Sequence, residues 1–510
     1  MTTPQRAKKT WRGVPSLIAI ERRSPQPLYQ QIYEYFRLRI TRGDLRAGQR
    51  VPSTRELARE LRISRLPVLN AYSQLIAEGH FQTRTGSGTF VASSIDSKLA
   101  GKEQGNGESP LQRRSISLHA RMVPKFERPS WAEHLGAFQV GQPELKTFPM
   151  HIWSRLLSRY SRELRVPALQ YGDPMGLAEL REILAVYLRT SRAVRCGPEQ
   201  IMIVNGSQQA LDITTRVLLD PGAPAWVEEP GYWLIHHVLA SGGCEAIPVP
   251  VDAEGLNVKT GAKLKRTARA VFVAPSHQYP MGVTMGATRR FQLLEWAHKS
   301  GSWIVEDDYD SEYRYDSKPI TSLQGLDDRD RVIYTGTLSK VLFPALRLGF
   351  IVIPLDLVER FAAVRQAMDI CPSHSSQAVL AAFIREGHFA RHIRRMRKLY
   401  EERRRVLLQE LERQLGASYE VMGTAAGMHL TLVLDDKFCD RKIAEKAIKR
   451  QLWLSALSLS YIGPSPRQGL VLGFGNTAST QIPRAVGLLK EILQQRGADR
   501  KNQLKDAAAG

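Results

Sequence analysis

One stretch, residues 93–117, divides this 510-residue chain into two parts of different character. It is rich in Gly, Ser and charged side chains and lacks the regular apolar spacing of a helix or strand, which indicates a linker. The organised residues 25–92 precede it, and a much longer organised stretch, 118–496, follows it. Because one fold cannot span such a break, the sequence predicts a small head domain and a large second domain. We expect the tail, residues 497–510, to be polar and flexible.

The formal net charge of +22 is concentrated in the head. Residues 1–92 hold 16 Lys and Arg against 6 Asp and Glu. A basic excess of this kind attracts polyanions, although basic surfaces can also be merely solubilising. No uncharged apolar run is long enough for a membrane span and no signal peptide is visible, so we expect a cytoplasmic protein. The four cysteines form no CxxC pair, and we expect neither a disulfide nor a metal site.

The head has the pattern of three helices followed by a hairpin. Apolar residues at every fourth position predict a helix over residues 27–42. Ser53 stands three residues before Glu56, which is a capping box for the start of a second helix. Ser64 follows a short turn and is a natural N-cap for a third helix. Residues 80–92 then read as a β-hairpin that turns at a Gly-Ser-Gly tip.

Two helices joined by a tight turn can place the N-terminus of the second in a DNA major groove, where Arg reads base edges. The alternative is a generic three-helix packing module without a ligand. The segment resembles the winged helix-turn-helix of the GntR regulators, whose motifs P-L-Y, P-S-x-R-x-L-A, S-R and G-x-G-T-F-V all occur here. Pro67 and Asn70 depart from the common family residues, so operator preference does not transfer. The resemblance implies that the following residues cap helices, contact DNA or form the wing: Ser53, Arg55, Ser64, Arg65, Gly86 and Gly88.

The second domain alternates short apolar runs with longer amphipathic segments, which is typical of an α/β fold with a mostly parallel sheet. The candidate strands are 200–205, 225–228, 268–274, 303–306, 332–335 and 349–353.

Several of these strands end in residues that suit pyridoxal 5′-phosphate (PLP). Lys340, in the run T-G-T-L-S-K, is the candidate for a Schiff base to the cofactor. Arg347 lies seven residues later and can hold a phosphate bidentately. Tyr232, after E-P-G, is the candidate aromatic residue over the ring. The predicted phosphate-binding residues, which include the start of a helix, are Gly206, Ser207, Gln208, Thr337, Ser339 and Arg347.

The run W-I-V-E-D-D at residues 303–308 ends an apolar strand in three acids, and Tyr309 follows. Three clustered carboxylates repel one another and need a cationic partner, which a protonated pyridine nitrogen would supply. We therefore assign Asp307 to that nitrogen and Tyr309 to the ring hydroxyl O3′. The alternative is a solvated acidic loop.

Residues 138–476 resemble the fold-type I PLP-dependent aminotransferases, which implies a small C-terminal α+β subdomain beside the main sheet. The motifs include Y-G-D-P-x-G from Tyr171, P-S-H-Q-Y-P-x-G from Pro275, and S-K with R-L-G seven residues after the lysine. With the head, the whole chain resembles the MocR subfamily of GntR regulators. That resemblance implies a homodimer in which PLP, alone or with an amine effector, alters binding to double-stranded operator DNA.

Two departures from the aminotransferase pattern bear on activity. Tyr279 replaces the usual Asn before Pro, so the contact to O3′ is expected to differ and to involve His277 or Gln278. Leu459 stands where many relatives carry an Arg for the substrate carboxylate, which makes efficient transamination less expected. Two alternatives to a PLP-responsive regulator stay open at this point: a working aminotransferase with an appended head, and a PLP-free scaffold that binds DNA constitutively.

Overall fold

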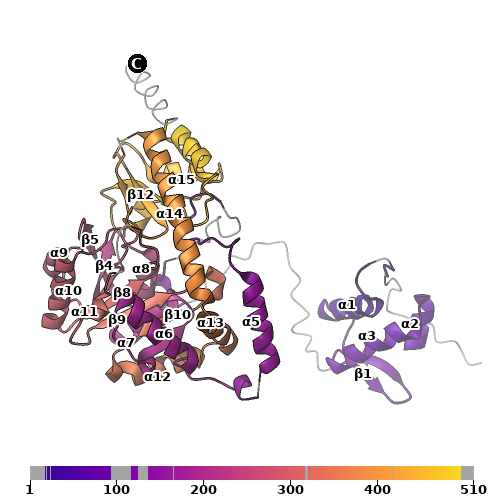
Figure 1. Ribbon diagram of the computed structural model, residues 1–510. Helices are drawn as coiled ribbons and strands as arrows, with labels where there is room; N and C mark the ends of the chain where they lie inside the picture. The colour runs from indigo at the N-terminus through magenta and orange to yellow at the C-terminus, as the bar shows by residue number, and fades with distance from the viewer. Residues whose placement is uncertain are drawn as a thin grey trace, which may run out of the picture. The chain divides into compact units, whose positions relative to one another are not determined.

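The computed structural model describes residues 18, 20–22, 24–92, 116–124, 136–164, 166–315, 320–416 and 419–494. The chain divides into two compact units, Met1–Ser115 and Ile116–Gly510 (Figure 1). Most of the predicted linker and the whole predicted tail lie outside the described residues. Within the described part of the chain, no helix is long and apolar enough to cross a membrane.

The first unit contains the three predicted helices and the predicted hairpin. Its elements are α1 (Leu28–Thr41), α2 (Thr54–Glu60), α3 (Arg65–Ala77), β1 (Phe81–Arg84) and β2 (Gly88–Val91). The apolar stripe of α1 packs through Phe36 against Tyr72 of α3 and Phe81 of β1, all three edge to face. The strands pair antiparallel, with Phe81 opposite Val91 and Arg84 opposite Gly88. The head is therefore a three-helix core closed by a two-stranded wing.

The second unit is built on one eight-stranded sheet with the order β3-β10-β9-β8-β7-β4-β5-β6. Neighbouring strands from β9 to β5 in that order are parallel, whereas β10 is antiparallel to β3 and β9. The six predicted strands are present and differ by one or two residues at their ends, whereas β5 and β6 were not predicted. The strands are β3 (Ile201–Val204), β4 (Pro224–Glu229), β5 (Glu245–Asp252), β6 (Gly255–Leu256), β7 (Ala270–Val273), β8 (Trp303–Asp308), β9 (Val332–Thr337) and β10 (Gly349–Val352).

Helices cover both faces of this sheet, because alternate residues of the buried strands join different apolar clusters. Ile201 and Ile203 pack with α5, α6 and α13, whereas Met202 and Val204 pack with α7 and α12. Strands buried on both faces are characteristic of parallel sheets. The helices of this part are α4 (Leu118–Met122), α5 (Met150–Glu163), α6 (Ala178–Arg192), α7 (Ser207–Leu218), α8 (Trp233–Ser241), α9 (Val258–Leu264), α10 (Ala287–Ser300), α11 (Leu323–Leu326), α12 (Val358–Asp369) and α13 (His374–Arg385).

A smaller antiparallel sheet with the order β11-β12-β14-β13 forms the predicted C-terminal subdomain. The long helix α14 and the shorter α15 lie beside it (Figure 1), and residues 482–494 form a further helix. Its core includes Tyr400 and Leu407 of α14 together with Leu430 of β12. The elements are α14 (His388–Leu415), β11 (Val421–Met422), β12 (His429–Leu434), α15 (Asp440–Ile448), β13 (Ser455–Ala456) and β14 (Gln468–Gly473).

Candidate functional site

The predicted cofactor residues gather at one edge of the large sheet. Parallel strands end at the same edge, which is where α/β proteins bind ligands. Tyr232 follows β4, Tyr309 follows β8 and Lys340 follows β9. Gly206 follows β3, which is antiparallel to β10 as β9 is and therefore ends at the same edge. The fold thus brings together residues that lie up to 134 positions apart in the chain, from Gly206 to Lys340.

Lys340 is partly buried and has a defined position at this edge. Its Nζ donates a hydrogen bond to the carbonyl oxygen of Gly141, 2.9 Å away. A Cβ at Gly141, whose φ is +70°, would stand 2.6 Å from that Nζ, so glycine is needed there. Burial lowers the pKa of Lys340, against the opposing effect of Asp310 and Asp307. A larger fraction of the amine is therefore unprotonated, the form in which an amine bonds covalently to an aldehyde.

The three acids of W-I-V-E-D-D are buried in β8, so the solvated acidic loop is wrong. Two of them are fully paired by distant residues. Glu306 accepts hydrogen bonds from the amides of Leu323 and Gln324 at the start of α11, both 3.0 Å long. Asp308 accepts from Arg192 at 3.2 Å and from the hydroxyl of Tyr334 at 2.6 Å. The strand tolerates these carboxylates because each has its own donors.

Of the three acids, Asp307 has the fewest hydrogen-bond donors among the described residues. Its hydrogen-bond donor is the hydroxyl of Thr335 at 3.3 Å, the residue opposite it on β9. Among the described residues, no Lys or Arg side chain forms an ion pair with it. Burial accordingly raises the pKa of Asp307 to about 7. A cationic ring nitrogen placed against this carboxylate would stabilise its ionised form, which fits the predicted role.

Three of the residues predicted to bind phosphate, Gly206, Ser207 and Arg347, lie at the N-terminus of α7. Gly206 is the N-cap of this helix at φ +84°. Arg347, itself at φ +50°, donates from Nη2 to the carbonyl oxygen of Asn205 at 2.7 Å. A Cβ at Gly206 would lie 3.0 Å from that guanidinium, so the glycine leaves room for Arg347 at the helix end. Free amides, a helix dipole and an arginine at one point suit an anion.

Two buried polar atoms of the predicted phosphate-binding residues lack partners within the described structure. They are the hydroxyl oxygen of Ser339 and the side-chain carbonyl oxygen of Gln208. The hydroxyl of Thr337 accepts from the amide of Ser339 at 3.2 Å, which holds that loop in place. Ser207 is the first residue of α7 and is partly buried. Because an unpaired buried hydroxyl is costly, Ser339 suits a phosphate oxygen as its acceptor.

Two tyrosines and the segment around Ser460 form one side of the site. The rings of Tyr232 and Tyr279 meet edge to face with centroids 6.0 Å apart. The amide of Gly231 donates to the carbonyl oxygen of Ser460 at 2.9 Å. Burial raises the pKa of Tyr279 to about 12, although a hydrogen bond with the Ser460 side chain opposes that effect. The segment that contains Leu459 therefore lies against the loop that carries Tyr232.

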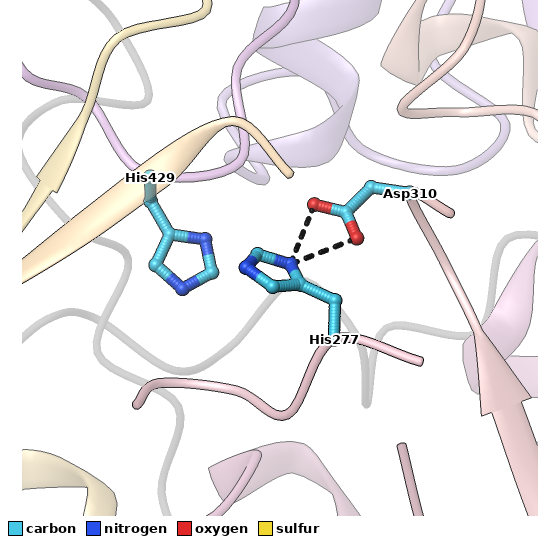
Figure 2. A group of neighbouring side chains, drawn as sticks. All are labelled: His277, Asp310 and His429. Atoms are coloured by element: carbon cyan, nitrogen blue, oxygen red, sulfur yellow. Dashed lines mark hydrogen bonds and ion pairs between the residues drawn. The ribbon is translucent and has the colours of Figure 1, made fainter. Parts of the chain in front are cut away.

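His277 and Gln278 have partners within the protein. The Gln278 amide nitrogen donates to the carbonyl oxygen of Pro230 at 2.8 Å, and its oxygen accepts from the amide of Met281 at 3.1 Å. His277 Nδ1 lies 3.1 Å from the hydroxyl of Tyr309 and next to the carboxylate of Asp310 (Figure 2). Of the two residues expected to assist at O3′, His277 thus reaches the site through Tyr309, whereas Gln278 holds its own loop.

In the head, the capping box that the sequence predicts is formed. The hydroxyl of Ser53 accepts from the amide of Glu56 at 3.2 Å, and the Glu56 carboxylate accepts from the amide of Ser53 at 2.9 Å. Ser64 occupies the N-cap position of α3, but its side chain makes no capping hydrogen bond, so the predicted cap is wrong in that respect. The reason is Pro67, which stands at the third helical position and has no amide hydrogen to donate.

The residues of the head that are predicted to contact DNA are all exposed to solvent. Arg65, at the start of α3, donates from Nε to the hydroxyl of Thr54 at 3.0 Å, which links the first turns of α2 and α3. Gly86 and Gly88 have φ of +75° and +111° at the wing turn. A Cβ at Gly88 would lie 3.1 Å from the guanidinium of Arg50. The six residues are all exposed: Ser53, Arg55, Ser64, Arg65, Gly86 and Gly88.

Several residues of the site were not predicted from the sequence. Gly141 lies 199 positions before Lys340, and only its Gly-x-Pro setting hinted at a turn. Asp310 directly follows Tyr309 and could have been singled out as a fourth acid of the cluster. His429 lies on β12 of the small sheet, in a run with no motif of its own. Its ring centroid stands 4.8 Å from that of His277.

Two family models match the chain. Aminotransferase class I and II covers residues 138–462, and the gntR family of bacterial regulatory proteins covers residues 28–91. The chain is 39% identical to the probable rhizopine catabolism regulatory protein MocR of Rhizobium meliloti, over 90% of this chain and 92% of that protein. It is 31% identical to the pyridoxine biosynthesis transcriptional regulator PdxR of Corynebacterium glutamicum, over 90% and 94%.

The second unit also matches solved structures. The kynurenine aminotransferase of Pyrococcus horikoshii superposes with a TM-score of 0.68 at 30% identity, over 75% of this chain and 97% of that one. The two family models lie on opposite sides of the predicted linker. Head and large domain together therefore match full-length regulators rather than aminotransferases alone.

Proposed function

The chain belongs to the MocR subfamily of GntR transcription regulators, and on that premise we propose that PLP held by Lys340 controls how the head binds operator DNA. The observation that carries this proposal is the grouping at one sheet edge of Lys340, with its lowered pKa, and Asp307, the acid of β8 with the fewest hydrogen-bond donors among the described residues. The anion pocket of Gly206 and Arg347 lies at the same edge. Each group suits a different part of the same cofactor.

Each of these residues would bind a different part of PLP. When bound, PLP supplies an aldehyde for amines and an electron-withdrawing ring. Lys340 would hold it covalently, and Asp307 would keep its ring nitrogen charged. Tyr232 would cover the ring, and Tyr309, beside Tyr279 and His277, would bind the ring hydroxyl. The phosphate would be held by Gly206, Ser207, Gln208, Thr337, Ser339 and Arg347.

Control of DNA binding requires that the effector bind two arrangements of the heads unequally. We propose a homodimer, in which two heads contact the two halves of an operator. Arg55 and Arg65 would read bases or phosphates, and the wing of Gly86 and Gly88 would approach the backbone. The effector is PLP itself or PLP together with an amine. Leu459, more than half exposed and apolar, favours an amine without a conventional α-carboxylate.

The test is whether the purified protein takes up PLP through Lys340. Wild type should absorb in the visible range, and borohydride should fix the cofactor covalently on the peptide that contains Lys340. Lys340→Ala should stay folded and lose this label. Lys299→Ala is the matched control, because Lys299 is exposed on α10 and bonds only Glu295 among the described residues. Equal labelling of wild type and Lys340→Ala would contradict the proposal.

The second candidate is a working aminotransferase with an appended DNA-binding head. The retention of Lys340, Asp307 and Arg347 in an aminotransferase fold favours it. One observation speaks against it. Arg441, which lies beside the segment of Leu459, donates a hydrogen bond to the hydroxyl of Ser458 at 3.0 Å. It is therefore already engaged and does not replace the missing arginine for a substrate carboxylate. Assays with amino donors and keto acid acceptors separate the two functions. Many turnovers per protein at rates of about 1 per second or faster would make catalysis primary.

A further inference from the structure

Figure 2 shows a buried cluster of three side chains, His277, Asp310 and His429, and His277 of this cluster lies 3.1 Å from the hydroxyl of Tyr309. His277 comes from the loop after β7, Asp310 follows β8, and His429 is on β12 of the small sheet. They are 2%, 1% and 3% exposed, respectively. Buried ionisable groups are retained only where their hydrogen bonds are specified, so the direction of each proton in this cluster can be derived.

The contact with Asp310 shows which ring nitrogen of His277 carries the hydrogen. Both oxygens of Asp310 lie within hydrogen-bond distance of His277 Nδ1, at 3.0 and 3.1 Å. A carboxylate only accepts hydrogen bonds, so Nδ1 must carry a hydrogen. The other ring nitrogen, Nε2, is buried without a partner in the described structure. A hydrogen placed there instead would leave a buried donor unpaired and a lone pair facing a carboxylate.

The position of this hydrogen then decides the direction of the Tyr309 proton. The Tyr309 hydroxyl oxygen lies 3.1 Å from the same Nδ1. Because Nδ1 already carries a hydrogen, the phenol cannot donate its own hydrogen to that nitrogen. The phenol's own proton must therefore point away from His277. Burial and the charge of Asp310 raise the pKa of Tyr309 well above its usual value, so the phenol keeps that proton.

Close packing holds the imidazole in this orientation. A Cβ at Gly427 would lie 1.9 Å from His277 Cε1 and 2.7 Å from an Asp310 oxygen, so only glycine fits. His429 packs its ring against that of His277, and its Nε2 lies 3.1 Å from the carbonyl oxygen of Pro280. Burial lowers the pKa of His429 to about 3, so it remains neutral. The side chains are of metal-binding types, but hydrogen bonds within the protein already account for their arrangement.

We propose that Asp310 and His277 are positioning residues that direct the proton of Tyr309 toward the ring oxygen of the bound cofactor. This inference rests on the proposed function, since it needs PLP at Lys340. It separates two roles that the acids of this segment would play: Asp307 would serve the ring nitrogen, whereas Asp310 would act on the ring oxygen through two other side chains. The titratable groups around Tyr309 and His277 are Glu228, Tyr279, Asp307, Asp310, Lys340 and His429.

The test measures the pH midpoint of the cofactor's absorbance change in the holoprotein. A donor at the ring oxygen stabilises the form that has lost its proton, so removal of the donor moves the midpoint to higher pH. Tyr309→Phe should raise it by about one pH unit or more, the size of one hydrogen bond to a charged group. In His277→Phe the Asp310 carboxylate loses its hydrogen-bond donor. We expect the Tyr309 hydroxyl then to donate its hydrogen bond to Asp310 instead of to the ring oxygen. The midpoint should then rise as it does in Tyr309→Phe.

The decisive variant is the double change of His277→Phe with Asp310→Leu, since leucine has the branched shape of aspartate. With the carboxylate also removed, the Tyr309 proton is free to return to the ring oxygen, and the midpoint should come back to within about 0.3 pH units of wild type. A merely structural role predicts that the double variant is worse than either single one. His298→Phe, in the separate His298 and Asp327 pair, is the matched control and should leave the midpoint unchanged.

The possible results are distinct. If wild type binds PLP but the double variant shifts as far as Tyr309→Phe, the inference is overturned and the proposed function stands. If wild type takes up no PLP, both fall. Removal of one partner of a buried pair can unfold a protein, whereas removal of both is often tolerated. Should His277→Phe fail to fold, Tyr309→Phe and the double variant still give the two midpoints that decide the matter.

Discussion

Replacement of Asp307 by asparagine should stabilise the cofactor-free protein at neutral pH and weaken its hold on PLP. Burial raises the pKa of Asp307 to about 7, whereas in the unfolded chain a free aspartate has its ordinary value of about 3.9. The folded state therefore binds more protons than the unfolded state between these values. Stability falls as the pH rises through this window, and by about 4 kcal/mol in all.

Asparagine keeps the shape of the side chain and cannot ionise, so it removes this cost. At pH 8 the cofactor-free Asp307→Asn protein should melt about 5 °C above wild type, given the melting entropy of a unit as large as Ile116–Gly510. The difference should shrink toward zero near pH 4. The same change should weaken PLP binding roughly tenfold or more, because the ring nitrogen loses its charged partner. Thermal melts across pH and a PLP titration measure both effects.

The neighbouring acid is the matched control, and the expected sign is opposite. Asp308 is equally buried but is paired with Arg192 and Tyr334. Asp308→Asn should destabilise the protein by about 1.5–3 kcal/mol, because the buried guanidinium of Arg192 loses the nearer of its two carboxylate partners and keeps only Glu312, 3.8 Å away. If Asp307→Asn lowers the melting temperature at pH 8 as Asp308→Asn does, Asp307 already has a partner in the cofactor-free protein. The assignment of Asp307 to the ring nitrogen would then lose its physical basis.

Three further predictions concern the head and the phosphate pocket. Ser53→Ala removes the capping box and should destabilise the head by about 1 kcal/mol. Thermal unfolding should show this as a lower melting temperature of the head, and an unchanged melting temperature would contradict a stabilising role of the box. Arg65→Ala should weaken specific operator binding while leaving the absorbance of the cofactor intact, in a gel-shift or fluorescence titration; unchanged affinity would exclude it from the interface. Gly206→Ala should weaken PLP binding, because a Cβ at φ +84° is strained and lies 3.0 Å from Arg347; equilibrium dialysis with PLP measures it, and wild-type affinity would contradict the pocket.

Local patterns predicted the head well because its elements are specified by neighbouring residues. The capping box of Ser53 and Glu56 spans three positions, and the structure forms it as predicted. The prediction that was wrong there, the side-chain cap by Ser64, could also have been corrected from the sequence. Pro67 in the first turn has no amide hydrogen to donate to a capping serine. The strand β5 was missed because Pro248 and Pro250 argue against a strand. It tolerates them near the edge of the sheet, where only short β6 lies beyond it.

The site was predictable only where its residues carry motifs. Lys340, Arg347 and the glycine at 206 stand in recognisable runs, but their partners come from far away in the chain. The sequence shows three equivalent acids in β8, and only the fold shows that Arg192 and the start of α11 engage two of them. That leaves Asp307 with one hydrogen-bond donor, Thr335, among the residues that the structure describes. His429 belongs to another sheet, so its place beside His277 could not be derived from spacing.

The central claim, that PLP at Lys340 controls operator binding, is tested most directly by one titration. The affinity of the purified protein for DNA from its own upstream region is measured at increasing PLP, for wild type and for Lys340→Ala. The account predicts that the affinity of wild type changes over the same PLP range in which its absorbance saturates, whereas the variant does not respond. A wild-type affinity that stays constant while the absorbance saturates would contradict it.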